Sequence, residues 1–351
     1  MVAPAPAPPL PQSPKKRLVR RTGKDRSQLL RRCVQAAFLL LNLWIGVEFY
    51  LFVRHYESGG ASPWAPRPSG VEGWLPIASL MNLKAYLLTG AVPSTHAAGM
   101  FLLIAFVCIS WVFRKSFCSW LCPVGTISEW LWRLGRDTFG RTRALPRWLD
   151  LPLRSLKYVL LGLFLYAVGS MSPPAIRQFL DSPYGMVADV KMMNFFRHMG
   201  TATAVTLAVL VVLSVFVQNF WCRYLCPYGA LLGLTALASP LKIQRRPAAC
   251  IDCAKCAKAC PSQLRVDRLV TIRSVECTGC LECVAVCPSQ GALAMAAPGG
   301  RGVPVWAMAA GMAIIFFGLV GYAQWAGYWQ TNVPSSVYFE RIPRASEYGH
   351  P

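Results

Sequence analysis

The sequence predicts an α-helical polytopic membrane protein with about five transmembrane helices and a small α+β module inserted before the last helix. Three observations lead to this prediction. The 351 residues are 54% hydrophobic, with a mean hydropathy of +0.39, which is too apolar for an ordinary soluble enzyme. Five apolar runs are long enough to cross a bilayer. A cysteine-rich segment separates the fourth run from the fifth.

The first 32 residues are expected to form a disordered, basic segment. Residues 1–14 are rich in Pro and Ala, and residues 15–32 carry nine Lys/Arg against one Asp. A twin arginine, Arg20 and Arg21, lacks the rest of an export signal, and the apolar run after it is long enough to span. We therefore expect an anchor and no cleaved signal.

The apolar runs define the expected domains. They lie near residues 33–53, 97–115, 156–172, 201–220 and 303–325. The expected organisation is a four-helix membrane domain over 33–240, the inserted module over 241–300, a fifth transmembrane helix over 301–327 and a tail over 328–351.

Basic residues flank the runs unevenly. The connections from Arg114 to Lys157 and from Arg223 to Arg301 hold nine and ten Lys/Arg, whereas residues 54–96 and 173–200 hold three each. By the positive-inside rule, the N-terminus and the two basic connections face the cytoplasm and the tail lies outside. Because topology explains the net charge of +21, we expect membrane lipid as a partner and no nucleic acid.

The sequence also contains an internal repeat. Residues 117–125 (FCSWLCPVG) match residues 221–229 (WCRYLCPYG) at an offset of 104, each at the inner end of an apolar run. The two runs also have a histidine near their outer start, His96 and His198. We expect two hairpins in the same orientation, related by an axis along the membrane normal.

The strongest chemical signal is a pair of identical cysteine runs in the inserted module. Cys250 and Cys277 each open a C-x2-C-x2-C-x3-C-P run. This is the bacterial ferredoxin pattern for two [4Fe-4S] clusters, in which the fourth cysteine of each run binds the other cluster. The expected ligand sets are Cys250, Cys253, Cys256 and Cys287 for cluster one, and Cys277, Cys280, Cys283 and Cys260 for cluster two.

The spacing has a physical reason. Thiolates are soft ligands for iron, and gaps of two residues wrap three cysteines around three corners of a cubane while backbone amides donate to sulfur. Zinc is the competing interpretation, but zinc ribbons do not use two such four-cysteine runs. Two clusters in one small module indicate electron transfer.

The repeat supplies two further cysteine pairs. In a helix, Cys118 and Cys122 would lie on one face, as would Cys222 and Cys226, although the proline after each pair disfavours helical geometry at the second cysteine. Three functions stay open: two redox-active thiol pairs, two soft-metal sites for copper, or one convergent four-thiolate site. The structural alternative is reduced cysteines that pack at helix ends.

Three other side chains are candidates for binding a quinone or a metal. His96 and His198 lie at the outer membrane face, where an imidazole binds a quinol, a haem or a metal, or simply ends a helix. Glu48 lies inside the first run, where an ionisable group is a candidate proton acceptor unless the interface solvates it. Cys33 and Cys108 match no motif.

The combination of two C-x3-C-P motifs at helix ends with the eight-cysteine module resembles the NosR/NapH/MauN/CcoG-type membrane-bound polyferredoxins, over about residues 33–325. The resemblance implies electron flow between the quinone pool or a cytoplasmic donor and a periplasmic reductase or its maturation system. The chain looks most like the membrane and ferredoxin portion of NosR without its flavin-binding domain, so FMN is not expected.

The expected function is therefore that of an iron-sulfur electron-transfer protein of the bacterial inner membrane. We expect an electron-transfer component, and whether it turns over a substrate of its own stays open. One alternative is a copper-handling or cupric-reducing assembly factor that uses the C-x3-C-P thiols. The other is a membrane anchor for a soluble redox partner.

Overall fold

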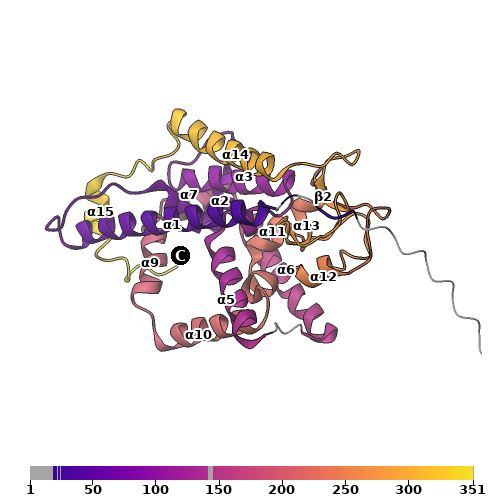
Figure 1. Cartoon of the computed structure of the whole chain (residues 1–351). Coiled ribbons are helices and arrows are strands. Elements are labelled where there is room, and N and C mark those ends of the chain that lie inside the picture. Colours follow the sequence, from indigo (N-terminus) through magenta and orange to yellow (C-terminus); the bar gives the residue numbers. More distant parts are fainter. Residues whose placement is uncertain (1–18, 22, 24, 141–144, 351) are drawn as a thin grey trace, which may run out of the picture.

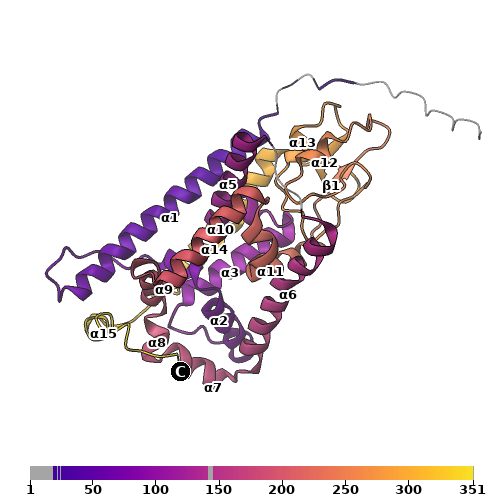
Figure 2. The ribbon, with the colours of Figure 1, turned by 90° about the horizontal axis from the view of Figure 1, so that it is seen from below.

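The computed structural model describes residues 19–21, 23, 25–140 and 145–350. Its long helices run between two ends of the molecule (Figures 1 and 2). The cysteine-rich segment with α12, α13 and the two strands lies at one end, which we call the module end. Helix α15 and the chain's C-terminal residues lie at the opposite end, the tail end (Figure 2).

The elements follow one another in chain order, with η1 and η3 as 3-10 helices and η2 as a π-helical turn. They are α1 (Ser27–Glu57), η1 (Ser69–Trp74), α2 (Pro76–Thr89), α3 (Ala97–Val112), α4 (Phe117–Trp120), α5 (Pro123–Phe139), α6 (Arg147–Ser170), α7 (Pro173–Leu180), α8 (Pro183–Met186), α9 (Ala188–Arg197), α10 (Thr201–Phe216), η2 (Trp221–Leu225), α11 (Pro227–Thr235), η3 (Ala236–Ala238), β1 (Lys242–Arg245), α12 (Lys255–Ala259), α13 (Glu282–Ala285), β2 (Leu293–Ala296), α14 (Val305–Trp325) and α15 (Ser335–Arg341).

Among the described residues, three helices are long and apolar enough to cross a membrane: α1, α6 and α14. A fourth candidate is the pair α9 and α10, which qualifies only as one element bent by 80°. The expected count of five is not reached, because the run predicted at 97–115 forms only the 16-residue α3, about 24 Å long. That helix ends before Arg114, whose left-handed backbone (φ 65°) turns the chain.

Helix α3 is a central, buried helix. Eleven of its 16 residues are buried, and it packs against α2, α11, α14 and η1. A helix that is hydrophobic on every side needs protein around it, so its apolar run reflects burial in the protein core as well as the membrane setting. The sequence pattern alone does not separate these two causes.

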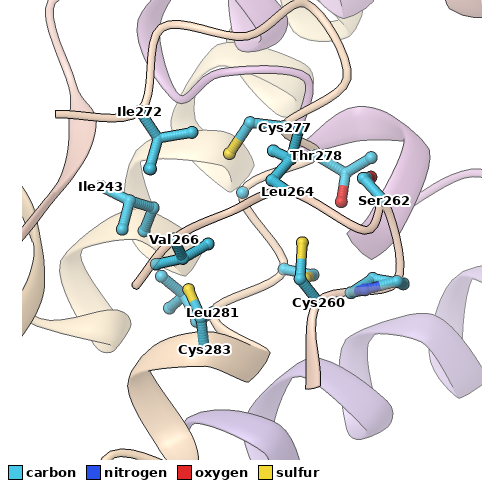
Figure 3. Close-up of a pocket in the computed structure, with 13 residues that line it drawn as sticks. Ile243, Cys260, Ser262, Leu264, Val266, Ile272, Cys277, Thr278, Leu281 and Cys283 are labelled. Atoms are coloured by element: carbon cyan, nitrogen blue, oxygen red, sulfur yellow. The ribbon is translucent and has the colours of Figure 1, made fainter. Parts of the chain in front are cut away.

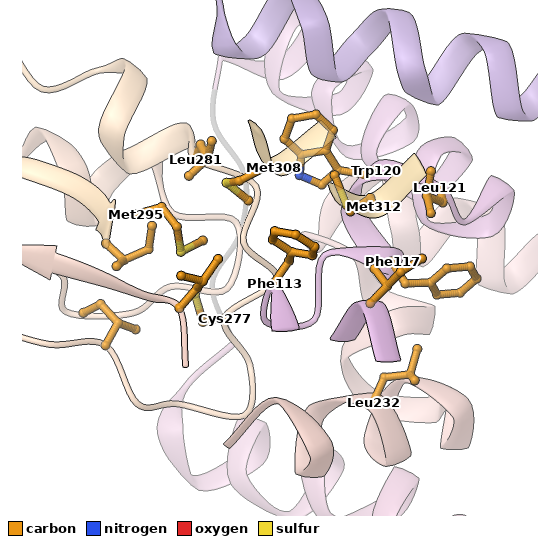
Figure 4. Close-up of a cluster of buried hydrophobic side chains, with 14 of the residues drawn as sticks. Phe113, Phe117, Trp120, Leu121, Leu232, Cys277, Leu281, Met295, Met308 and Met312 are labelled. Carbon is orange, nitrogen blue, oxygen red and sulfur yellow. The ribbon is translucent and has the colours of Figure 1, made fainter. Parts of the chain in front are cut away.

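One hydrophobic core joins the helices to the module (Figure 4). Phe113, which follows α3, lies in the same cluster as Leu281 and Met295 of the module. Met308 and Met312 of α14 complete this junction and are both buried. The module is therefore packed onto the membrane helices by a shared core.

The module itself is a small α+β unit. Strand β1 pairs antiparallel with β2, with Ile243 opposite Met295. Between the strands in sequence lie α12 and α13, which carry Cys256 and Cys283, respectively. The strands fall inside the range 241–300 expected for this unit.

The N-terminal segment differs from the expectation of disorder over residues 1–32. Helix α1 begins at Ser27, six residues before the predicted span. The backbone N–H of Arg21 donates to the carbonyl of Pro288 (3.1 Å), and Arg20 forms a β-bridge with Ser289. The described part of this segment is ordered because the module satisfies its backbone groups. Residues 1–18 lie outside the described residues.

Replacing Gly135 with alanine tests the close contact between α5 and α10. A Cβ at Gly135 would overlap the carbonyl oxygen of Val215, so the two backbones would have to separate. We expect Gly135→Ala to lower the free energy of unfolding by about 1–3 kcal/mol, measured as a lower melting temperature in detergent by circular dichroism. Gly162→Ala on α6 is the matched control, because nothing lies within 4 Å of its added Cβ. Equal melting temperatures for the two variants would contradict the contact.

Candidate functional site

The two cysteine runs fold alike. In each run, the residues just before and just after the second cysteine have a left-handed backbone: Asp252 and Ala254 around Cys253, and Gly279 and Leu281 around Cys280. The third cysteine then lies on a short helix, α12 or α13. These turns wrap the chain around a centre and expose backbone N–H groups to it, as a ligand loop for a cluster requires.

Four cysteines from both runs line one apolar pocket of the module. They are Cys260 of the first run and Cys277, Cys280 and Cys283 of the second. Figure 3 shows the sulfur atoms of Cys260, Cys277 and Cys283 on different sides of the same space. The structure thus brings together the four side chains that the spacing assigns to cluster two. The pocket wall is formed by Ile243, Leu264, Val266, Ile272 and Leu281.

Burial governs the ionisation of these thiols. It raises the pKa of Cys280 to about 12, although the nearby Arg31 guanidinium acts in the opposite direction. It also raises the pKa of Cys283, and the neighbouring thiols of Cys280 and Cys277 add to that shift. Without a metal these thiols stay protonated at neutral pH, so iron binding must displace their protons.

The other four module cysteines lie nearer the solvent. Cys253 is exposed and Cys250 and Cys287 are half-buried, whereas Cys256 is buried. Cys287 of the second run lies within electrostatic range of Cys250 and Cys253 of the first. The structure therefore also brings the cluster-one set together across the two runs.

The donor set fits an iron-sulfur cluster. Within the described residues, no three His, Cys, Asp or Glu side chains have the spacing that holds a single metal ion. In a cubane each thiolate binds its own iron atom, so the sulfurs stand farther apart than around one ion. Four thiols in a largely apolar pocket match the soft ligation that such clusters need.

The C-x3-C-P cysteines lie together at the module end of the membrane helices. Cys118 is on α4 and Cys122 caps α5, while Cys222 is on η2 and Cys226 caps α11. Burial raises the pKa of Cys118 to about 11 and that of Cys122 to about 12, and Cys226 raises both further. The pKa of Cys222 is raised by burial and then by the other three thiols. We call these four residues the four-thiol site.

Buried cations surround the four-thiol site. Lys115 and Lys157 are 3% and 0% exposed, and Lys157 donates to Glu276 at 2.6 Å. Lys115 lies within electrostatic range of Cys118 and of Glu276. Cys33 and Cys108 belong to other elements, α1 and α3.

His96 is held in a buried charge cluster near the tail end. Its Nε2 lies 2.9 Å from the Gly185 carbonyl, and its Nδ1 lies 3.3 Å from the Arg67 guanidinium and 3.4 Å from the Glu72 carboxylate. Arg67 also pairs with Asp189 at 2.7 Å. Burial opposes the ionisation of Glu72, yet Arg67 and His96 lower its pKa to about 2. Both imidazole nitrogens therefore have protein partners.

The other two candidates for a quinone or metal site lie elsewhere. His198 is exposed just after α9, and Glu48 is half-buried on α1. The sequence pairs His96 with His198, but the two have different surroundings. His96 is buried with a left-handed backbone (φ 57°), whereas His198 follows the end of α9 and is exposed to solvent.

Sequence reasoning missed an arginine beside cluster two. Arg31 on α1 is fully buried and forms a double hydrogen bond with Glu129 of α5, at 2.6 and 2.7 Å. It also pairs with Glu282 of α13 at 2.9 Å, and Arg133 bonds the same carboxylate. The sequence shows Arg31 only as one of the basic residues of the N-terminal segment, because its partners lie 98 and 251 residues away.

Comparison with known proteins agrees with these sites. The family described as a 4Fe-4S binding domain matches residues 95–142 and again 199–246, two segments offset by the same 104 residues as the C-x3-C-P pairs. The family described as a 4Fe-4S dicluster domain matches residues 242–288. No solved structure matches the chain significantly.

Similar chains carry electron-transport and ferredoxin-type names. YccM of Escherichia coli K12, named as a candidate electron transport protein, is 50% identical over 326 residues, which is 91% of each chain. The ferredoxin-type protein MauN of Paracoccus denitrificans is 30% identical over 66% of this chain and 75% of its own. The regulatory protein NosR of Pseudomonas aeruginosa is 28% identical over 54% of this chain and only 27% of its own.

The similarity to YccM extends over nearly the whole length of both proteins, and the matched 4Fe-4S domains include all twelve motif cysteines. With its candidate membrane spans, the chain belongs to the membrane-bound polyferredoxins, a family of ferredoxin-type 4Fe-4S electron transport proteins.

Proposed function

We propose that this protein carries electrons between the cytoplasmic face and the membrane interior through two [4Fe-4S] clusters, with ligands exchanged between the two cysteine runs. The observation that carries the proposal is the apolar pocket in which Cys260 joins Cys277, Cys280 and Cys283. A cluster there is shielded from water yet packed against the membrane helices, which suits a carrier better than a soluble catalyst.

The two clusters differ in exposure, and this gives the chain of carriers an order. Cluster one includes the exposed Cys253 and is the entry or exit point for a soluble partner. Cluster two is enclosed, and its ligand Cys280 lines a second pocket together with Cys118 and Cys222 of the four-thiol site. Electrons would therefore pass between solvent, cluster one, cluster two and the membrane domain.

The proposed topology places the N-terminal segment and residues 241–300 in the cytoplasm and the tail over 328–351 in the periplasm of a bacterial inner membrane. The charge counts support this orientation, and the module and the tail lie at opposite ends (Figure 2). The partners would be the quinone pool or a cytoplasmic donor on one side and a periplasmic redox or maturation protein on the other.

A redox titration followed by EPR tests the proposed function. Membranes that contain the protein should show cluster signals that appear on reduction by quinol or by a soluble cytoplasmic donor. Membranes from cells with an empty vector are the control. Clusters that no such donor reduces would leave only a structural role for the iron and would overturn the proposal.

If the fourth cysteine of each run binds the other cluster, the iron lost in some double variants should not equal the sum of the losses in the two single variants. Cys260→Ser and Cys283→Ser should each remove about four iron atoms per chain, and the double variant should lose no more than either single variant, because both residues bind cluster two. Combining Cys260→Ser with Cys256→Ser should instead remove about eight, because Cys256 belongs to cluster one. Iron analysis and EPR on the purified protein measure this. The reverse pattern would mean that each run holds its own cluster.

The exposed cations near cluster one predict a preference for an acidic partner. Lys255 and Lys258 on α12 flank this cluster and are exposed. The double charge reversal Lys255→Glu/Lys258→Glu should slow reduction by a prereduced acidic ferredoxin about tenfold at low salt, with a smaller effect at high salt. Stopped-flow absorbance measures the rate. Arg54→Glu on the far part of α1 is the control, and an equal slowing there would contradict a local docking site.

A further inference from the structure

The four-thiol site is built by both halves of the sequence repeat. Each matched 4Fe-4S binding segment holds one C-x3-C-P pair, which is half of the four thiolates that a [4Fe-4S] cluster requires. The pairs meet across the molecule, since Cys222 lies within electrostatic range of Cys118 and Cys122 as well as Cys226. A complete ligand set therefore exists only where the two halves come together.

The residues after each pair shape the site. In each half the second cysteine caps a helix that begins with proline, so Cys122 lies at the N-terminus of α5 and Cys226 at that of α11. The backbone N–H of Gly229 donates to Sγ of Cys226 at 3.3 Å. Free N–H groups and the helix dipole stabilise a thiolate at this position.

Glycine is needed at the third position of α5 for close approach. A Cβ on Gly125 would overlap the carbonyl oxygen of Cys118, so only glycine lets the first turn of α5 lie against the first cysteine of its pair. The same position in the other half is Gly229, whose added Cβ would lie 3.6 Å from both the Cys222 carbonyl and the Cys226 sulfur. The motif thus reads C-x3-C-P-x-G, with a glycine that close approach requires at Gly125 and with ordinary van der Waals room at Gly229.

The buried charged residues around the four-thiol site carry a net positive charge. Lys115 and Lys157 share one carboxylate, Glu276, so two cations minus one anion leave one excess positive charge. All three residues are at most 8% exposed. Lys115 lies within electrostatic range of Cys118, Cys222 and Cys226. Because an uncompensated buried cation is costly, a negatively charged group among the thiols would stabilise this arrangement.

We propose that Cys118, Cys122, Cys222 and Cys226 together bind a third [4Fe-4S] cluster, shared by the two halves of the repeat, that exchanges electrons with cluster two. Four thiolates give such a cluster a net negative charge, which the excess cation at Lys115 compensates in part. This inference rests on the proposed function and extends its chain of carriers into the membrane domain.

The transfer step is a simple electron exchange. One electron leaves an iron of the reduced cluster two, which is oxidised, and enters an iron of the third cluster, which is reduced; no bond is made or broken. Cys280 of cluster two and Cys118 and Cys222 of the four-thiol site line the same pocket, so the two ligand sets border one space. Lys115 lines that pocket as well and lies where negative charge would increase on reduction.

Iron and acid-labile sulfide analysis of the full-length protein, purified without oxygen, tests the third cluster. We expect about twelve iron atoms per chain, against about eight for the module alone. Cys118→Ser and Cys226→Ser should each remove about four, with the EPR signals of the two module clusters retained as evidence of folding. Cys108→Ser on α3 is the matched control and should keep all the iron.

A second measurement does not depend on losing the cluster. Lys115→Gln should keep the full iron content but lower the midpoint potential of one cluster, because removal of a nearby positive charge disfavours reduction. Arg54→Gln, exposed on the far part of α1, should leave all potentials unchanged. Unchanged potentials in Lys115→Gln would contradict its place beside a redox centre.

Three results would overturn the third cluster: about eight iron atoms in the unaltered protein, stoichiometric copper or zinc that is lost in Cys118→Ser, or a disulfide among the four thiols found by mass spectrometry after alkylation. Failure here is distinguishable from failure of the proposed function, because the module clusters are read by their own EPR signals.

Discussion

Buried positive charge is concentrated where the module meets the membrane helices. Arg31, Arg114, Lys115 and Lys157 are each at most 3% exposed. Taking such charges out of water costs several kcal/mol per ion and is offset only by close, fully hydrogen-bonded partners. Arg31 meets this condition with the carboxylates of Glu129 and Glu282, which belong to α5 and the module. The module therefore docks where Arg31 is paired with carboxylates from both α5 and the module.

Apolar packing and hydrogen bonding make different contributions at this junction. The shared core around Phe113 supplies contact area without fixing direction, because apolar attraction is not directional. The hydrogen bonds of Arg114 to the carbonyls of Ala236 and Ser274 do have direction and set the orientation of the module. Rigid placement matters here, because an electron carrier works only when its neighbours stay at a constant separation.

Local patterns and distant contacts were predictable to different degrees. The spacing of the module cysteines encodes their own turns, so the sequence could predict that Cys260 joins the second run. The length of α3 could not be predicted, because burial inside protein and burial in lipid leave the same apolar pattern. The spacing of the C-x3-C-P pairs does not predict whether the two pairs form one site, since only tertiary structure decides whether Cys118 and Cys222 meet. The repeat places His96 and His198 at similar positions, but their surroundings differ, because His96 lies in a buried charge cluster and His198 is exposed to solvent.

The tail closes the opposite end of the molecule. Thr331 donates to Glu72, 259 residues earlier in the chain, and Tyr338 packs on Phe52 of α1. A ribosome makes the chain from its N-terminus, so Arg67, Glu72 and His96 exist long before these partners do. The buried charges of this cluster are incompletely paired until Thr331 has been made and has folded against Glu72. Biosynthesis therefore completes this end last, after the cysteine-rich module has been made at the other.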